Sequence, residues 1–378
     1  MVTRQVLVTG MAWDTALGDD LDGVWSRLLA GETGLREVPS AHRLRNLKAA
    51  TVDDPPARWT PARRQISLGV RTVGRALQDA GIDGGPGEAL LVLGTSYGAH
   101  LDDTRASGLH DWAAAVAGQL GFARPPVSVS TACSSGADAI LVGGHLVAAG
   151  MAEVAVCGGV DILTTAKRLG HSALGTMSPT LLRAFDEAGD GTLLGEGAGI
   201  VVLEEAGRAE RRRARAYAEL LGGGSANDAV GMTAPDPSGA AVLLAVRRSL
   251  AAAGLRTDQV AVVNAHGTGT PVNDAVEAAS FARLFPDADR PVLFATKGAF
   301  GHTLGATGAI EAIALVQALR HGKVPPVYGL DTVAPGLTLP VPQGAPVALG
   351  PGAGLSVTLG FGGFNTSLVF AGAADGLG

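Results

Sequence analysis

Short apolar runs alternate with longer amphipathic segments along most of the chain. The apolar runs contain few charged residues, which is typical of strands buried on both faces of a sheet. They predict two sets of five strands, at residues 5–9, 89–94, 127–130, 154–158 and 199–204, and at residues 216–222, 259–264, 291–295, 355–359 and 367–371. The amphipathic segments predict helices at residues 20–30, 64–80, 108–120, 135–149, 240–253, 274–285 and 305–321.

The two strand sets follow one another in a similar order, so we expect an α/β protein with two similar halves. The N-terminal half covers residues 1–207 and the C-terminal half residues 208–378, and we expect one integrated unit rather than separable domains. The halves join at the arginine-rich stretch 208–216. This stretch is interpreted as a solvated connector in preference to a docking patch.

Composition narrows the possible functions. Hydrophobic residues make up 47% of the chain and charged residues 17%, which provides ample apolar surface for a large core. The formal net charge of −6 argues against nucleic-acid binding, and no apolar stretch is long enough to span a bilayer. Two cysteines cannot form a disulfide framework, and the first residues do not match a secretory signal. We therefore expect a cytoplasmic protein.

The first candidate for chemistry is Cys133 in the string TACSSG, between a predicted strand and a predicted helix. The start of a helix favours a thiolate through the helix dipole and the free N–H groups. Two interpretations stay open from this string alone. Cys133 is either an activated nucleophile or a buried cysteine that acts as a small hydrophobic residue.

Two histidines and a lysine also follow predicted strands. His266 lies in NAHGTGT, and Lys297 and His302 lie in TKGAFGHTLGA, whose helix carries Glu311. Ligand crevices in α/β sheets form beyond the carboxyl ends of strands, although a turn histidine with a satisfied hydrogen bond fits equally. A glycine-rich turn, GFGGFN, separates the last two predicted strands. No phosphate-binding loop or dinucleotide motif is present.

Taken together, these strings resemble one family. TACSSG, NAHGTGTPVND, TKGAFGHTLGATGAIE and LGFGGFN, in this order, are similar to the elongating β-ketoacyl-acyl-carrier-protein synthases of the thiolase-like superfamily. The string RAFDEAGDGTLLGEGAG and several N-terminal strings extend the resemblance over almost the whole chain. Initiating synthases pair cysteine with histidine and asparagine, and thiolases use a second cysteine near the C-terminus. Here the other cysteine, Cys157, lies mid-chain and is interpreted as core.

The resemblance implies a role for each catalytic residue. Cys133 would accept the acyl chain from a thioester, while His266 and His302 would promote decarboxylation of a malonyl thioester and stabilise the enolate. The resemblance makes Lys297 the residue that organises the histidines, held by Glu311. It places the oxyanion hole at the backbone N–H groups of Cys133 and Phe361.

The resemblance also implies a fold and partners. It predicts a five-layered αβαβα arrangement of mixed sheets, a homodimer or a heterodimer with a chain-length subunit, and substrates carried on the phosphopantetheine of an acyl carrier protein, without a metal or other cofactor. Residues 127–130 would pair across the dimer axis. Carrier docking is assigned to Arg63 and Arg64, with Arg58 as a further candidate.

Thr268 and Thr270 would bind the phosphopantetheine arm, and Thr192, Phe361 and Phe364 would line the substrate pocket. The chain departs from the family pattern in three ways. Residues 98–125 and 36–64 look shortened, Thr192 stands where phenylalanine or tyrosine is usual, and Phe364 stands where many fatty-acid enzymes have threonine. These departures predict that the enzyme accepts a bulkier or more rigid acyl chain and acts in type II polyketide or specialised fatty-acyl biosynthesis.

Two alternative functions stay open. One is an acyltransferase that forms an ester or amide, and the other is a non-catalytic subunit that shapes another synthase's pocket.

Overall fold

The computed structural model describes residues 4–52, 59–82, 84–102, 108–286 and 291–373. Within these ranges ten strands form one mixed sheet in the order β10-β9-β13-β14-β8-β1-β7-β6-β4-β5. They are β1 (Val6–Asp14), β4 (Leu90–Gly94), β5 (Val127–Val129), β6 (Val154–Asp161), β7 (Gly197–Glu205), β8 (Ala218–Asn227), β9 (Val260–Asn264), β10 (Val292–Phe294), β13 (Ala353–Gly360) and β14 (Phe364–Gly372). Two small hairpins are separate, β2 (Leu35–Glu37) with β3 (Lys48–Ala50) and β11 (Lys323–Val324) with β12 (Val347–Ala348).

The sheet consists of two halves with the same topology. In the N-terminal half β4 is parallel to β5 and β6, and β7 is antiparallel to β6 and β1. In the C-terminal half β9 is parallel to β10 and β13, and β14 is antiparallel to β13 and β8. The halves join where Leu7 and Val8 of β1 pair with Glu219 and Ala218 of β8. The predicted fold of two similar mixed-sheet halves is confirmed.

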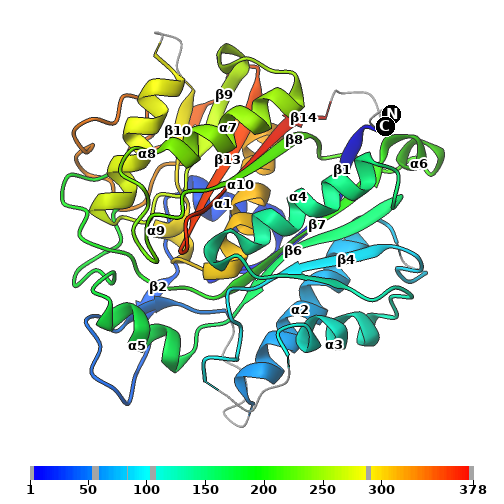
Figure 1. The fold of residues 1–378 in the computed structure, drawn as a ribbon, viewed down its shortest axis with the longest axis horizontal. Helices are drawn as coiled ribbons and strands as arrows, with labels where there is room; N and C mark the ends of the chain where they lie inside the picture. Colours follow the sequence, from blue (N-terminus) through cyan, green and yellow to red (C-terminus); the bar gives the residue numbers. More distant parts are fainter. Residues whose placement is uncertain (1–3, 53–58, 83, 103–107, 287–290, 374–378) are drawn as a thin grey trace.

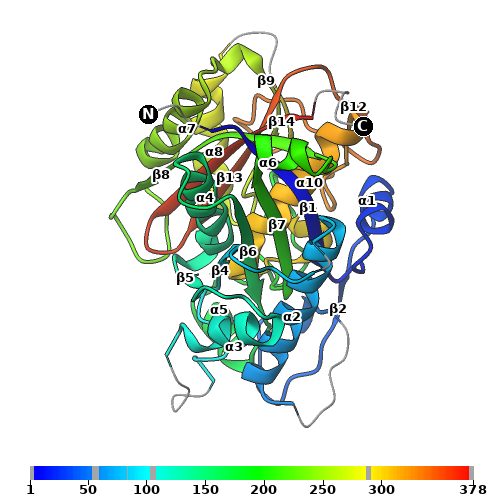
Figure 2. The same cartoon turned by 90° about the vertical axis from the view of Figure 1, so that its right-hand side faces the viewer.

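Helices complete five layers (Figures 1 and 2). One outer layer is α2 (Pro61–Asp79) with α3 (Asp111–Leu120), and the other is α7 (Ala240–Ala253) with α8 (Pro271–Leu284). The central layer is α4 (Ser135–Ala148) and α10 (Thr307–His321), which contact strands of both halves. The other helices are α1 (Leu21–Leu29), α5 (Thr165–Ala173), α6 (Ala206–Arg211) and α9 (Lys297–Phe300), with short 3-10 turns at η1 (Ala132–Ser134), η2 (Thr257–Gln259) and η3 (Leu304–Ala306).

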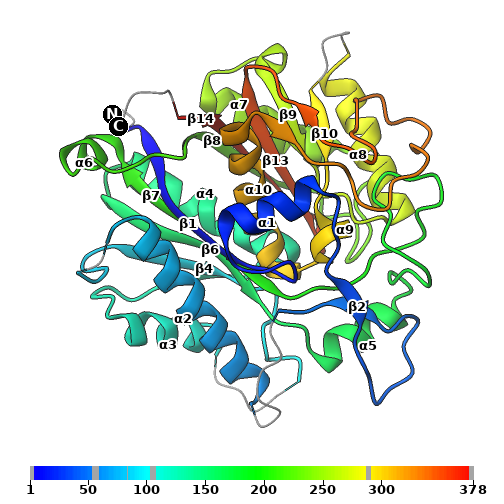
Figure 3. The same ribbon diagram turned by 180° about the vertical axis from the view of Figure 1, so that it is seen from behind.

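Helix α1 lies over α10 when the molecule is seen from behind (Figure 3). The Gln317 side chain donates a hydrogen bond to the Leu21 carbonyl at 3.2 Å. Helix α10 is buried from Thr307 to Ala318, so its exposed end begins only in the last turn. No helix in the described ranges is long and apolar enough to cross a membrane.

Glycines allow the central helices and their turns to approach closely. A Cβ atom on Gly136 would lie 2.9 Å from the Gly305 carbonyl oxygen, and one on Gly305 would lie 2.2 Å from the Ser96 nitrogen. Neither contact is possible for a larger residue without movement of backbone. The starts of α4 and α10 are thereby held against each other.

All the predicted strands and helices appear, with errors at their ends. Strand β8 was expected to end at residue 222, but it continues to Asn227 through three glycines. The strand continues there because α7 packs against it so closely that a Cβ on Gly224 would lie 2.5 Å from the Ala245 carbonyl oxygen. Helices α5, α6 and α9 and the two small hairpins were not predicted.

The prediction of a solvated connector holds for Arg211 and Arg215, which are 66% and 54% exposed, but not for Arg208 and Arg212. Arg208 and Arg212 both form ion pairs with Glu204, a fully buried residue of β7, with Arg212 Nη2 at 2.6 Å from Oε2. A buried carboxylate requires such partners. This part of the connector is therefore fastened to the N-terminal half.

We propose that the halves fold as one unit, because each buries part of the other. Leu141 of α4 packs on Gly223 of β8, and Ile310 of α10 packs on Gly199 of β7. Residues 1–207 expressed alone should therefore expose α4 and the inner sheet face, bind a hydrophobic dye and lack a cooperative thermal transition, whereas the full chain unfolds in one transition. A cooperatively folded 1–207 fragment would contradict this proposal.

Candidate active site

Cys133 lies in the tight turn η1 between strand β5 and helix α4. Ala132, the preceding residue, has a φ of 52°, a left-handed conformation that is uncommon for a residue with a Cβ. The carboxylate of Asp138, one turn into α4, accepts hydrogen bonds from Thr131 Oγ1 at 2.6 Å and Ser134 Oγ at 2.8 Å. These bonds fix the turn on which the thiol is presented.

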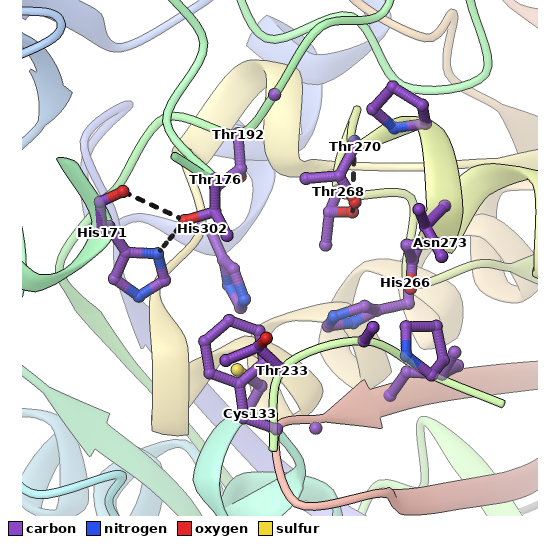
Figure 4. Close-up of a pocket in the computed structure, with 18 of the residues that line it drawn as sticks. Cys133, His171, Thr176, Thr192, Thr233, His266, Thr268, Thr270, Asn273 and His302 are labelled. Carbon is purple, nitrogen blue, oxygen red and sulfur yellow. Dashed lines mark hydrogen bonds between the residues drawn. The ribbon is translucent and has the colours of Figure 1, made fainter. Parts of the chain in front are cut away.

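Cys133, His266 and His302 line one cavity of about 220 Å³. Figure 4 shows the thiol below the two imidazoles, which point toward the same space. The lining also includes four other predicted residues, Thr192, Thr268, Thr270 and Phe361. The fold thus brings together residues that are more than 200 positions apart.

Three of the predicted catalytic and substrate-binding residues do not line this cavity. Lys297 and Glu311 lie behind the histidines, where they form a buried ion pair. The Phe364 ring lies against Gly362, where a Cβ on Gly362 would be 3.1 Å from Phe364 Cε2. Phe364 therefore shapes the glycine-rich turn rather than the pocket wall.

Hydrogen bonds fix the tautomers of both histidines. Lys297 Nζ donates to His266 Nδ1 at 3.0 Å, and the Leu304 N–H donates to His302 Nδ1 at 3.3 Å. An Nδ1 atom that accepts carries no proton, so each neutral ring carries its proton on Nε2. The ring centroids are 5.3 Å apart and nearly perpendicular. The site therefore presents two Nε2–H donors.

Burial keeps these rings neutral. It lowers the pKa of His266 well below the usual value, and Lys297 and His302 lower that pKa further. Burial and Lys297 lower the pKa of His302 in the same direction. Burial raises the pKa of Glu311 to about 7, against the opposing effects of Lys297 and Thr358. Lys297 Nζ is paired with Glu311 and also donates a hydrogen bond to the His266 carbonyl.

The pKa of the Cys133 thiol differs from the expectation. Burial raises its pKa to about 11, although the Phe361 N–H and Lys297 act in the opposite direction. The helix start was predicted to favour a thiolate, and this prediction is wrong for the unliganded enzyme because desolvation dominates. The Phe361 N–H nevertheless points at the sulfur, which fits its predicted place in an oxyanion hole.

Two acidic residues of α8 support the His266 loop and were not predicted. Glu277 accepts hydrogen bonds from the N–H groups of His266 at 2.8 Å and Gly267 at 2.7 Å. Asp274 accepts from the Gly269 N–H at 3.2 Å. Burial raises the pKa of Asp274 to about 6 and that of Glu277 to about 8. The sequence signal that could have identified them is their position, in the first turns of a helix that follows the His266 loop.

His171 of α5 also lines the cavity and was not predicted. Its ring stacks on Phe361, with centroids 5.6 Å apart and planes at 20°. Its Nδ1 lies 2.9 Å from Thr176 Oγ1. Burial lowers the pKa of His171 to about 4, so the ring is neutral. Helix α5 was missed, and with it this residue.

The two arginines assigned to carrier docking have different surroundings. Arg64 Nη2 donates to both carboxylate oxygens of buried Glu196, at 2.8 and 2.7 Å, so this side chain is bound internally rather than free on the surface. Arg63 is exposed, with its guanidinium 4.8 Å from the centre of the Trp59 ring. Neither lines the cavity, and Arg58 lies outside the described residues.

A duplicated five-layer fold with a buried cysteine and two neutral histidines in one cavity defines a class, the thiolase-like enzymes that transfer acyl groups. The family can be stated more closely. The sequence profile "Beta-ketoacyl synthase, N-terminal domain" matches residues 3–209, and "Beta-ketoacyl synthase, C-terminal domain" matches residues 217–331. The chain belongs to the beta-ketoacyl synthase family and is an acyltransferase that forms carbon–carbon bonds.

Individual relatives agree with this assignment. The chain is 32% identical to "3-oxoacyl-[acyl-carrier-protein] synthase II, chloroplastic" of Arabidopsis thaliana, over 97% of this chain and 76% of that protein. It is 31% identical to "3-oxoacyl-[acyl-carrier-protein] synthase 2" of Vibrio cholerae, over 98% and 99%. A solved structure titled "The ishigamide ketosynthase/chain length factor" superposes with a TM-score of 0.91 at 27% identity, over 98% and 100%. The Vibrio alignment spans 413 positions against 378 residues here, so it includes at least 35 positions that this chain lacks.

The raised pKa of Cys133 gives a test of the unliganded site. Because the pKa is about 11, the thiolate fraction should rise tenfold per pH unit across the range below it. Alkylation by iodoacetamide, followed by intact mass, should therefore accelerate log-linearly from pH 7 to 9.5 without a plateau. Cys133→Ala is the control, since it leaves only buried Cys157, whose pKa burial also raises. A plateau below pH 9 would show that the thiol is activated before substrate binds.

Proposed function

We propose that this enzyme joins an acyl group held on Cys133 to a malonyl unit on an acyl carrier protein, with loss of carbon dioxide. The observation that carries the proposal is the pair of Nε2–H donors on His266 and His302 in the cavity of Cys133. Neutral donors suit an enolate, because they stabilise negative charge without protonating it fully. A site for simple hydrolysis needs no such pair.

In the first half-reaction the Cys133 sulfur attacks the thioester carbonyl of the acyl carrier. The carbonyl oxygen becomes an oxyanion, for which the N–H groups of Cys133 and Phe361 are the proposed donors. The intermediate collapses with release of the carrier's thiol, which takes up the proton lost by Cys133. The acyl group is then a thioester of the enzyme.

In the second half-reaction the malonyl thioester loses carbon dioxide, and its electron pair becomes an enolate. The Nε2–H groups of His266 and His302 hold the enolate oxygen. The enolate carbon attacks the Cys133 thioester, forms the new carbon–carbon bond and expels the Cys133 thiolate, which is reprotonated. Lys297 and Glu311 do not touch the reacting atoms and act as positioning residues for His266.

The carrier's phosphopantetheine is proposed to lie along the wall formed by Thr268 and Thr270. Their hydroxyl oxygens are 2.8 Å apart and face the cavity opposite His171 and Thr176 (Figure 4). Hydroxyls suit the amide groups of such an arm. The two thioesters and one proton from water, which the expelled Cys133 thiolate takes up, balance the steps above, so we propose no metal or further cofactor.

We propose a pathway of type II polyketide or specialised fatty-acyl synthesis. Thr192 lines the cavity and takes less room than the aromatic residue expected there, which suits a bulkier or more rigid chain. The similarity to the ishigamide ketosynthase/chain length factor also supports a role in this kind of pathway. Both cysteines are free thiols, and we place the enzyme in the cytoplasm.

Strand β5 is the proposed dimer contact, with a second copy or a related chain-length subunit. It lies at an end of the sheet and pairs with β4. Val127 is 36% exposed, and the nearby Tyr97 and Leu109 are exposed apolar side chains. An exposed strand edge with apolar neighbours is a surface that proteins normally cover.

The two half-reactions test the proposed function directly. His266→Ala and His302→Ala should each slow decarboxylation of malonyl carrier by roughly 100-fold or more, because each removes an enolate donor. Acylation of Cys133 by an acyl thioester, measured by intact mass, should change much less. Cys133→Ala should abolish acylation while leaving the thermal midpoint unchanged within a few degrees. Equal loss of both half-reactions in the histidine variants would contradict the division of roles.

The reaction product distinguishes the proposed condensation from the two alternative functions that the sequence left open. A condensing enzyme releases carbon dioxide and a β-ketoacyl carrier, whereas an acyltransferase of the other kind releases an ester or amide. A pocket-shaping subunit would show no acylation of Cys133 at all.

Carrier docking is proposed at Arg63, the exposed member of the predicted pair. Arg63→Glu should raise KM for acyl carrier roughly threefold or more at low salt and leave KM for a small thioester unchanged, since acidic carriers are attracted electrostatically. Arg256→Glu, at an exposed arginine on the other half, is the matched control. Arg64→Glu should instead lower the thermal midpoint, because it leaves Glu196 unpaired. An unchanged KM in the Arg63 variant would exclude this surface.

A further inference from the structure

Thr192 is held rigidly at the cavity wall by its backbone. Its N–H donates to the Thr176 carbonyl and its carbonyl accepts from the Ser178 N–H, both at 2.8 Å. The next residue, Leu193, accepts a hydrogen bond from the His302 N–H at 2.7 Å. The wall that carries Thr192 is therefore fastened to the backbone of a catalytic histidine.

The side chain of Thr192 has no such partner. The residue is 2% exposed and lines the cavity, and its hydroxyl has no hydrogen-bond partner among the described residues. A buried hydroxyl without a partner is unfavourable, so such groups are normally paired. The oxygen is closed off from the cavity in this orientation, and rotation about the Cα–Cβ bond would turn it toward a substrate atom there.

The adjacent wall is polar as well. Thr176 Oγ1 donates to the His171 carbonyl at 3.3 Å, which makes His171 Nδ1 the donor to Thr176 and leaves Nε2 as an acceptor. Thr176, Thr192 and His171 lie on one side of the cavity in Figure 4, across from Thr268, Thr270 and Asn273. A wall meant only for a hydrocarbon chain would not need these groups.

We propose that the Thr192 hydroxyl hydrogen-bonds an oxygen atom carried by the acyl chain on Cys133, so that the enzyme favours an acyl group with a carbonyl or hydroxyl near the thioester over a saturated chain. This inference rests on the proposed condensation. A saturated chain of the same length fills the cavity but leaves the hydroxyl unpaired, and a site built around a hydrogen bond discriminates against a substrate that lacks it.

The test compares two variants on three matched substrates. Thr192→Val keeps the shape and removes the hydroxyl, while Thr192→Ser keeps the hydroxyl. The probes are the pantetheine thioesters of octanoate, 3-oxooctanoate and 3-hydroxyoctanoate, and the readout is the rate of Cys133 acylation by quench and intact mass. The ratio of wild-type to variant rate for each substrate cancels differences in chemical reactivity.

Thr192→Val should slow acylation by the oxygenated chains about tenfold and leave octanoyl transfer unchanged or faster. Thr192→Ser should behave like the wild type. Because no protein partner is lost, the thermal midpoint of Thr192→Val should not fall.

An equal effect of Thr192→Val on all three chains, or an effect confined to malonyl decarboxylation, would overturn the inference while leaving condensation intact. A lowered thermal midpoint would overturn it too, since it would show that the hydroxyl has a structural partner. If no thioester acylates wild-type Cys133, the proposed function itself fails.

Discussion

The site depends on one buried cation. The Lys297 ammonium contacts His266 at both its ring and its carbonyl and is balanced by Glu311, with both side chains 1% exposed. It occupies the Nδ1 side of His266, so that ring can only donate from Nε2. It also lowers the pKa of both histidines in addition to burial. Removing one member of such a pair leaves an uncompensated charge in a dry interior, at a cost of about 3–5 kcal/mol. The lysine therefore sets the direction of His266 and, after burial, helps to keep both histidines neutral.

The duplicated fold divides the chemistry between its halves. Cys133 precedes α4 in the N-terminal half, and His302 precedes α10 in the C-terminal half. In each half a short 3-10 turn leads into the helix and contains one residue with a left-handed backbone conformation. These residues are Ala132, with a φ of 52°, and Leu304, with a φ of 51°. The two turns meet at the central glycines, Gly136 against Gly305. The geometry of the active site is thus the geometry of the contact between α4 and α10, and a change in that contact would move the nucleophile relative to the histidine.

The strand and helix pattern was readable from the sequence because most elements are apolar and bounded by glycine or charged residues. The catalytic residues could be predicted from their sequence strings because each string follows a strand, and the fold places the ends of these strands together. Three features were not readable. The continuation of β8 through Gly222–Gly224 depends on the packing of α7 against it. The ion pair of Arg64 with Glu196 joins residues that are 132 positions apart in the sequence. Helix α5, which carries His171, has a polar face that other segments bury. Each depends on tertiary contacts rather than on local preference.

The raised pKa of Cys133 and the lowered pKa values of the histidines have the same cause. Burial disfavours charge on each of these three groups, so the thiol keeps its proton and the imidazoles do not gain one. All three groups are therefore neutral before a substrate arrives. Negative charge first appears on the substrate's own oxygen, either as the tetrahedral oxyanion or as the enolate. Donors that are already in place then act in a medium of low dielectric, where each hydrogen bond to charge is stronger than in water. By the time the enolate forms, Cys133 is a thioester, so the enolate oxygen meets an uncharged sulfur and two neutral Nε2–H donors. The raised pKa of the thiol therefore matters for the first half-reaction, in which the helix start and the Phe361 N–H assist the loss of its proton.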